Sequence, residues 1–119
     1  MQPRFHLSIG VPSLDESIAF FTDLLGGTIA HRDPSGYVNV DLFGTELTLK
    51  TSRDAIAGDL HFGLNFARDE FDRIAARILA SGYAGVVAAP RVVDAGTSIE
   101  RKKMYLRCPA GYLIELKGY

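Results

Sequence analysis

The chain has 119 residues, of which 47% are hydrophobic and 23% are charged, a composition typical of one soluble globular domain. Thirteen basic and fourteen acidic side chains give a net charge of −1, so nucleic-acid or membrane-surface binding has no excess of positive charge to support it. A lone cysteine, Cys108, excludes an internal disulfide, and the sequence has neither a signal peptide nor an apolar run of about 18 residues, so we expect a cytoplasmic protein.

The first half of the chain predicts one strand, one helix and three more strands. Residues 5–11 alternate between apolar and small or polar side chains, as in a strand with two unlike faces. Ser13 stands three residues before Glu16, the spacing of a helix capping box. Apolar residues at helical spacing then predict a helix over 14–25, which Gly26 ends. Strand-length segments bounded by turn residues follow at 28–32, 37–43 and 46–51.

The second half repeats this order after a linker predicted at 52–58. A strand is expected at 59–66 and a helix at 70–80, whose apolar side carries Phe71, Ile74, Ile78 and Leu79. Three further strands are predicted at 83–88, 102–107 and 112–117. The chain therefore reads as two tandem βαβββ modules, over residues 4–51 and 59–119.

The two halves align when the second is shifted back along the first until His61 falls on His6. The ends of the last strands then make Thr48 the counterpart of Glu115. His61 and Glu115 are farther apart in the sequence than His6 and Thr48, so the second half carries an insertion. We place it in a loop over 90–103, and loops of this length are often functional.

Neither module is large enough to bury a sheet face by itself. Paired edge to edge, the two modules would form one α+β domain with a curved, partly open mixed sheet around a cavity. His6, His61 and Glu115 would then converge on that cavity. A chain this short is also close to the size at which oligomerisation adds useful core, so we expect a homodimer.

Several segments together resemble the vicinal oxygen chelate superfamily, which includes glyoxalase I, extradiol dioxygenases, fosfomycin-modifying thiol transferases and bleomycin-binding proteins. The resemblance spans nearly the whole chain and rests on the segments at 5–9, 17–21, 23–26, 61–64 and 109–116. It implies the fold of two βαβββ modules described above.

The resemblance implies a metal site formed by His6, His61 and Glu115. Two imidazoles and one carboxylate suit a divalent first-row metal with open coordination positions, such as iron, manganese, zinc or nickel. Glyoxalase relatives add a fourth carboxylate ligand, but the equivalent residue here is Thr48, a weak ligand. Glu46 lies one pleat away, where we expect it to act as a base or a substrate contact at the cavity mouth.

Three further residues are candidates to line the substrate site. The resemblance to fosfomycin-modifying relatives implies that Tyr105 and Ser8 face substrate. Arg91 lies in the predicted loop near a run of basic residues (Arg101, Lys102 and Lys103) that would attract an anionic substrate. His31 has no counterpart in the repeat and is predicted to be a surface residue.

The leading functional hypothesis is a metal-dependent enzyme that holds a small molecule through adjacent oxygens, as a dioxygenase, thiol transferase or lyase. Three protein ligands favour dioxygenase or transferase chemistry over that of a four-ligand glyoxalase. The alternative is a metal-free binding module, like the bleomycin-sequestering proteins, which holds an apolar or aromatic ligand and performs no chemistry.

Overall fold

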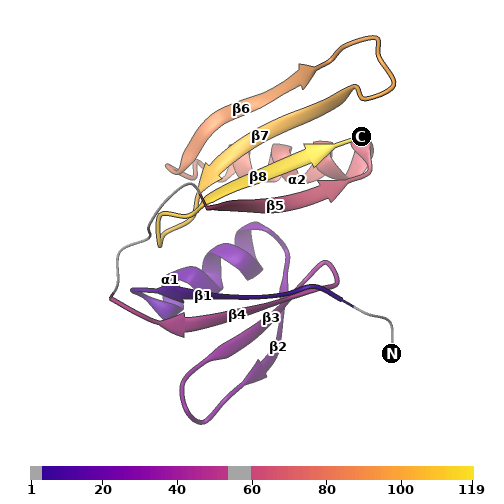
Figure 1. Cartoon of the computed structure of the whole chain (residues 1–119). Coiled ribbons are helices and arrows are strands. Elements are labelled where there is room, and N and C mark those ends of the chain that lie inside the picture. Colours follow the sequence, from indigo (N-terminus) through magenta and orange to yellow (C-terminus); the bar gives the residue numbers. More distant parts are fainter. Residues whose placement is uncertain (1–3, 54–59) are drawn as a thin grey trace. The chain divides into compact units, whose positions relative to one another are not determined.

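The computed structural model describes residues 4–53 and 60–119, and the chain divides into two compact units, Met1–Ala55 and Ile56–Tyr119. Each unit holds a four-stranded mixed sheet, with helical segments on one face (Figure 1). The predicted α+β fold with two βαβββ repeats is therefore confirmed. Most of the predicted linker, residues 54–58, lies outside the described ranges.

Unit 1 contains six elements in chain order: β1 (His6–Val11), α1 (Leu14–Ala19), the π-helix η1 (Phe20–Leu24), β2 (Thr28–Arg32), β3 (Val38–Leu42) and β4 (Thr45–Thr51). Its sheet has the order β1-β4-β3-β2, in which β1 runs parallel to β4 and the other pairs are antiparallel. The first strand of the unit thus lies directly beside its last strand.

The predicted helix over 14–25 forms, but not as one continuous α-helix. The backbone N–H of Glu16 donates to the side chain of Ser13, so the predicted N-cap is confirmed. From Phe20 onward the segment is π-helical, as the bond from Leu25 N–H to the Phe20 carbonyl shows. The wider turn lets both Phe20 and Phe21 reach the core, where their rings pack edge to face 4.9 Å apart.

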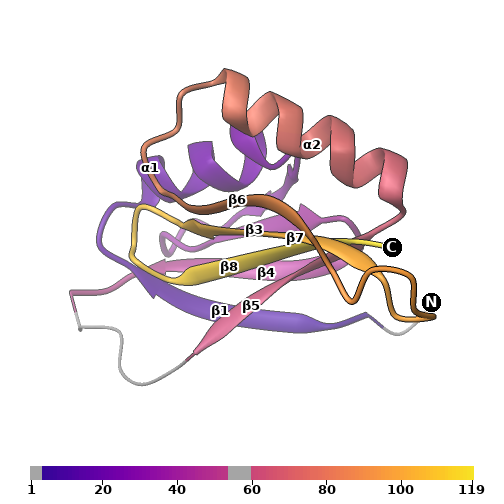
Figure 2. The ribbon, with the colours of Figure 1, turned by 90° about the horizontal axis from the view of Figure 1, so that it is seen from above.

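Unit 2 contains five elements: β5 (His61–Phe66), α2 (Arg68–Ala80), β6 (Val86–Val93), β7 (Arg101–Arg107) and β8 (Leu113–Gly118). The sheet order β5-β8-β7-β6 repeats that of unit 1, again with the first strand parallel to the last. Figure 2 shows α2 running along one side of this sheet. Within the described ranges, no helix has the length and apolar character needed to cross a membrane.

The apolar side of α2 is narrower than predicted. Phe71, Ile74 and Ile78 are buried, but Leu79 is 49% exposed and so does not belong to the core. Leu79 follows Ile78 directly, and the step of about 100° between neighbouring helical residues turns it away from the sheet.

Half of the loop predicted over 90–103 is strand, at its two ends. Strand β6 continues to Val93 and β7 begins at Arg101, so the extra residues of the second half lengthen a β-hairpin. Pro90 lies inside β6, at an irregularity in the pairing between Ala88 and Arg91. Because β6 is the edge of its sheet, a residue without an N–H is tolerated there.

Each sheet has one apolar and one polar face, because successive strand residues point to opposite sides. The apolar faces are buried and supply most of the core, with Val11, Val40, Leu47 and Leu49 in unit 1 and Met104, Leu106, Ile114 and Leu116 in unit 2. We call the opposite side the polar face of each unit. It carries the histidines and Glu115, so the burial of the apolar side decides where these functional groups point.

Gly63 allows β5 to approach β8 very closely. A Cβ added to Gly63 would overlap the backbone carbonyl of Glu115. We predict that Gly63→Ala forces the strands apart and lowers the free energy of unfolding by about 1–3 kcal/mol, the usual cost of overpacking. Urea unfolding would measure the change.

Asn65→Ala provides a matched control for that measurement. Asn65 is an exposed residue on the same strand and face, so its truncation should change stability by no more than about 0.5 kcal/mol. Equal stability of Gly63→Ala and the wild-type protein would contradict the close approach.

Candidate functional site

The strand pairing tests the repeat alignment directly. In unit 1, Thr48 pairs with Ser8, two residues after the first histidine. In unit 2, Glu115 pairs with Gly63, two residues after the second histidine. Thr48 and Glu115 therefore occupy equivalent positions, as the sequence alignment predicted.

The polar face of unit 2 is organised around the Glu115 carboxylate, whose side chain is only 9% exposed. Tyr105, directly opposite on β7, donates its hydroxyl to Oε2 at 2.8 Å. The Lys103 ammonium contacts the same oxygen at 3.0 Å. The other oxygen, Oε1, lies 3.8 Å from Nε2 of His61 and 3.9 Å from Nζ of Lys117.

These contacts fix the charge of both partners. Burial by itself would raise the pKa of Glu115, but the hydrogen bonds from Tyr105 and Lys103, with the charges of both lysines, hold it below its ordinary value. Contacts with Tyr105 and Glu115 raise the pKa of Lys103. Near neutral pH the face therefore holds a carboxylate beside an ammonium.

The polar face of unit 1 places a different carboxylate beside its histidine. Glu46, opposite His6 on β4, brings Oε1 to 2.9 Å from Nδ1 of that histidine. Arg4 lies 3.6 Å from the other oxygen of Glu46. Glu46 therefore contacts His6 itself, a closer relation than the predicted role at a cavity mouth.

The side chain of Thr48 is buried in unit 1, and its hydroxyl already has a hydrogen-bond partner. It is 5% exposed, and its hydroxyl donates to Oδ1 of Asn39 at 2.7 Å. Asn39 lies opposite Thr48 just as Tyr105 lies opposite Glu115. Unit 1 thus has a neutral pair at the position where unit 2 has a charged one.

Each polar face bounds a small cavity. The unit 1 cavity has a volume of about 310 Å³ and is lined by His6, Ser8, Tyr37, Asn39, Glu46, Thr48 and Lys50. The unit 2 cavity, about 190 Å³, is lined by His61, Phe62, Gly63, Leu64, Asn65, Glu115 and Lys117. Ser8, Glu46 and Thr48 thus share one cavity with His6, whereas His61 and Glu115 share the other.

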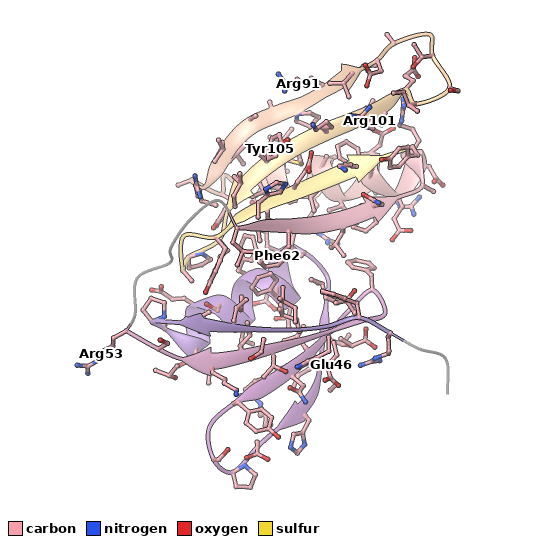
Figure 3. The ribbon with its side chains drawn as sticks, in the orientation of Figure 1. Glu46, Arg53, Phe62, Arg91, Arg101 and Tyr105 are labelled. Carbon is pink, nitrogen blue, oxygen red and sulfur yellow. The ribbon has the colours of Figure 1, made fainter. Side chains whose placement is uncertain are left out.

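The basic residues predicted to form an anion-attracting loop lie on strands, and Arg101, Lys102 and Lys103 each contact a different carboxylate. Figure 3 shows Arg91 on β6, one strand beyond Tyr105. It is exposed and does not line the unit 2 cavity. Lys102 pairs with Asp72 of α2 at 2.7 Å, while Lys103 points to the polar face.

Two lysines of the unit 2 face were missed as members of the site. Strand alternation places Lys103 on the side of Tyr105, two residues later, and Lys117 on the side of Glu115. That signal was present in the sequence, because Lys103 belongs to the strand predicted at 102–107. Lys103 was instead grouped with the basic residues of the predicted loop and so was left out of the site. His31, by contrast, is exposed on β2 beside Asp33, as predicted.

The donor types fit a divalent metal. One ion bonded to both a histidine nitrogen and a carboxylate oxygen spans up to about 4.2 Å. The 3.8 Å between His61 and Glu115 is within that reach, and Oε1 is the oxygen not bound by Tyr105. In the described part of the chain, no three histidine, cysteine, aspartate or glutamate side chains are gathered as a metal site, and His6 belongs to the other unit.

Comparisons with solved structures identify relatives across the full chain. A glyoxalase/bleomycin resistance protein/dioxygenase from Alicyclobacillus acidocaldarius is 28% identical, with a TM-score of 0.81 over 98% of this chain and 91% of that one. Lactoylglutathione lyase from Agrobacterium tumefaciens is 20% identical, with a TM-score of 0.75 over 99% and 94%. TioX from Micromonospora sp. ML1 is 14% identical, with a TM-score of 0.77 over 98% of each chain.

No curated protein matches the chain. The family model of the Glyoxalase/Bleomycin resistance protein/Dioxygenase superfamily matches residues 5–116, which include both βαβββ repeats with His6, His61 and Glu115. The chain therefore belongs to this superfamily, as its resemblance to the vicinal oxygen chelate proteins indicated.

Proposed function

We propose that this protein is a metal-dependent enzyme that binds a small molecule through two adjacent oxygens, with His6, His61 and Glu115 as the protein ligands. One observation carries the proposal. Glu115 is nearly buried, with Oε2 held by Tyr105 and Lys103 and Oε1 facing His61 at 3.8 Å. A carboxylate fixed in this way presents one oxygen to an ion without further reorganisation.

The bound metal would supply Lewis-acid polarisation of the substrate oxygens, or electron transfer if it is iron. Thr48 occupies the position of a fourth ligand and is already bonded to Asn39, so three protein ligands remain. Three ligands leave room for a bidentate substrate or for dioxygen. This favours dioxygenase or thiol transferase chemistry over lyase chemistry of the four-ligand kind.

Contact with Glu46 prepares His6 for the same role. A neutral imidazole whose Nδ1–H donates to Glu46 presents Nε2 as its acceptor nitrogen. Metal-binding histidines commonly donate their second nitrogen to a carboxylate, which fixes the tautomer and the ring orientation. Glu46 is then an orienting residue for His6 rather than a ligand.

Two assemblies would bring His6 to His61 and Glu115. The units of one chain can pair with each other, or each unit can pair with the complementary unit of a second chain in a homodimer. We propose that the protein is a homodimer, because a chain of this length is close to the size at which oligomerisation adds useful core.

The metal-free alternative also has an observation in its favour. The Lys103 ammonium already lies 3.0 Å from the Glu115 carboxylate, so this buried charge has a counter-charge without any metal. In that case the protein would bind its ligand without chemistry, in the manner of a sequestering protein.

We predict that protein purified without chelator contains a first-row divalent metal, and that His6→Ala, His61→Ala and Glu115→Ala each lose most of it. Each change removes one of three ligands, whereas the control His31→Ala removes a histidine outside the proposed site and should keep the metal. Elemental analysis measures the content, and its identity narrows the chemistry, since iron supports oxygen chemistry and manganese supports transfer. Absence of metal in the wild-type protein, together with unchanged thermal stability of the His6→Ala, His61→Ala double variant, would leave the binding module as the function.

The same variants distinguish the two assemblies. His6→Ala and Glu115→Ala chains are unfolded together, refolded and tested for metal. If the ligands come from two chains, about one quarter of the sites in a random mixture of dimers is intact, so binding partly returns. If they come from one chain, every site keeps a defect and no metal binds.

We predict that Glu46→Ala weakens metal binding by about tenfold or more, the usual effect of removing a carboxylate that orients a ligand histidine. Competition with a fluorescent chelator would measure the affinity. Asp41→Ala is the control, because Asp41 lies opposite Glu46 and also contacts Arg4, at 3.7 Å, but it is two strands away from His6. Equal affinities of Glu46→Ala and the wild-type protein would exclude the orienting role.

A further inference from the structure

Around Glu115, the polar face of unit 2 has more positive than negative side chains. Glu115 is the one carboxylate among the described residues that line the cavity. Two ammonium groups approach it, that of Lys103 at 3.0 Å from outside the lining and that of Lys117 at 3.9 Å from within it. One carboxylate balances one of these charges. The second positive charge is left for a bound molecule to neutralise.

Of the two lysines, Lys117 is the one placed to contact a bound anion. Its distance of 3.9 Å from Glu115 is longer than an ordinary hydrogen bond from nitrogen to oxygen, so the contact does not use its N–H donors. Its side chain is 29% exposed, against 17% for Lys103, and it belongs to the cavity lining. Lys103 holds the carboxylate, and Lys117 faces the space beside it.

The rest of the lining points to a small and polar ligand. A volume of about 190 Å³ is below the roughly 300–1,000 Å³ of pockets for drug-sized molecules. His61, Asn65 and Lys117 supply hydrogen-bond donors around that space. An apolar or aromatic ligand would leave these groups without partners, at the cost of burying them unsatisfied.

Unit 1 has the same feature at the equivalent position. Lys50 follows Thr48 by two residues, as Lys117 follows Glu115, and it lines the unit 1 cavity with His6 and Ser8. Each cavity is therefore bordered by a lysine, Lys50 in unit 1 and Lys117 in unit 2. Only the unit 2 cavity contains Glu115.

We propose that the molecule bound in the unit 2 cavity is a small oxyanion, carrying a carboxylate whose charge Lys117 neutralises beside Glu115 and His61. This rests on the proposed function in one respect, that adjacent oxygens of the same molecule face the metal ligands. A cation on Glu115 would add positive charge to a face where two lysines already surround one carboxylate. It would therefore strengthen the preference for an anion.

Oxalate and oxamide form a matched pair of probes, because both carry adjacent oxygens on a two-carbon frame and only oxalate is charged. Calorimetric titration of the full chain should show oxalate binding at least about tenfold more tightly than oxamide. Lys117→Met should remove most of that difference by weakening oxalate binding and leaving oxamide binding unchanged. The control Lys102→Met removes a lysine that pairs with Asp72 instead and should behave as wild type.

Titrations of chelator-treated protein and of dialysed, metal-loaded protein separate this inference from the proposed function. An oxalate preference that depends on Lys117 in chelator-treated protein supports the inference even if no metal ever binds. Metal binding without a preference for oxalate over oxamide overturns the inference and leaves the proposed function intact. A preference lost in Lys50→Met but kept in Lys117→Met also overturns it, because the anion would then lie in unit 1. Urea unfolding of each variant ensures that a loss of binding reflects the site, and a Lys117→Arg variant that restores oxalate binding supports the role of charge.

Discussion

Parallel pairing between the first and last strands of each unit is the interaction on which the rest of the structure depends. It brings together residues that are far apart in sequence, such as His6 and Glu46 or Gly63 and Glu115. A parallel pair needs a long connection, and the helix and two strands between provide it. The helical segments cover one face of each sheet, so the polar side chains of the paired strands all remain on the other. The candidate ligands His6, His61 and Glu115 all lie on these paired strands, and so does Lys117.

The two repeats differ at one equivalent position, Thr48 in unit 1 and Glu115 in unit 2, and the residues that contact this position differ with it. Where unit 1 has Thr48, a single neutral partner, Asn39, satisfies the buried hydroxyl. Where unit 2 has Glu115, a buried carboxylate would be costly without compensation, and both a hydroxyl and an ammonium contact it. Lys103 and Tyr105 therefore compensate for the burial of a carboxylate at this position. Lys117, at 3.9 Å from the carboxylate, adds a second positive charge to the same face.

Most of the fold could be predicted because its signals are local. The cap at Ser13, the strand alternation and the order of elements within each repeat all depend on neighbours in sequence, and the strand pairs confirmed the equivalence of Thr48 and Glu115. The π-helical turn and the length of β6 could not be read in the same way. The first depends on how two phenylalanines pack in the core, and the second on pairing with β7 across a hairpin. Partners on another strand decided these features, whereas the side on which Lys103 lies could have been read from strand alternation.

The two histidines occupy the same repeat position but differ in how firmly they are held. Glu46 lies opposite His6 at hydrogen-bond distance, whereas the residue opposite His61 is Leu113, which has no polar side-chain atom to orient a ring. His61 instead faces Oε1 of Glu115 at 3.8 Å, too far for a hydrogen bond and near enough to share an ion. In the proposed metal site, unit 1 would contribute an oriented donor, and unit 2 would contribute a pair whose geometry a bound cation completes. Neither cavity by itself contains all three proposed ligands, because His6 lines one cavity while His61 and Glu115 line the other.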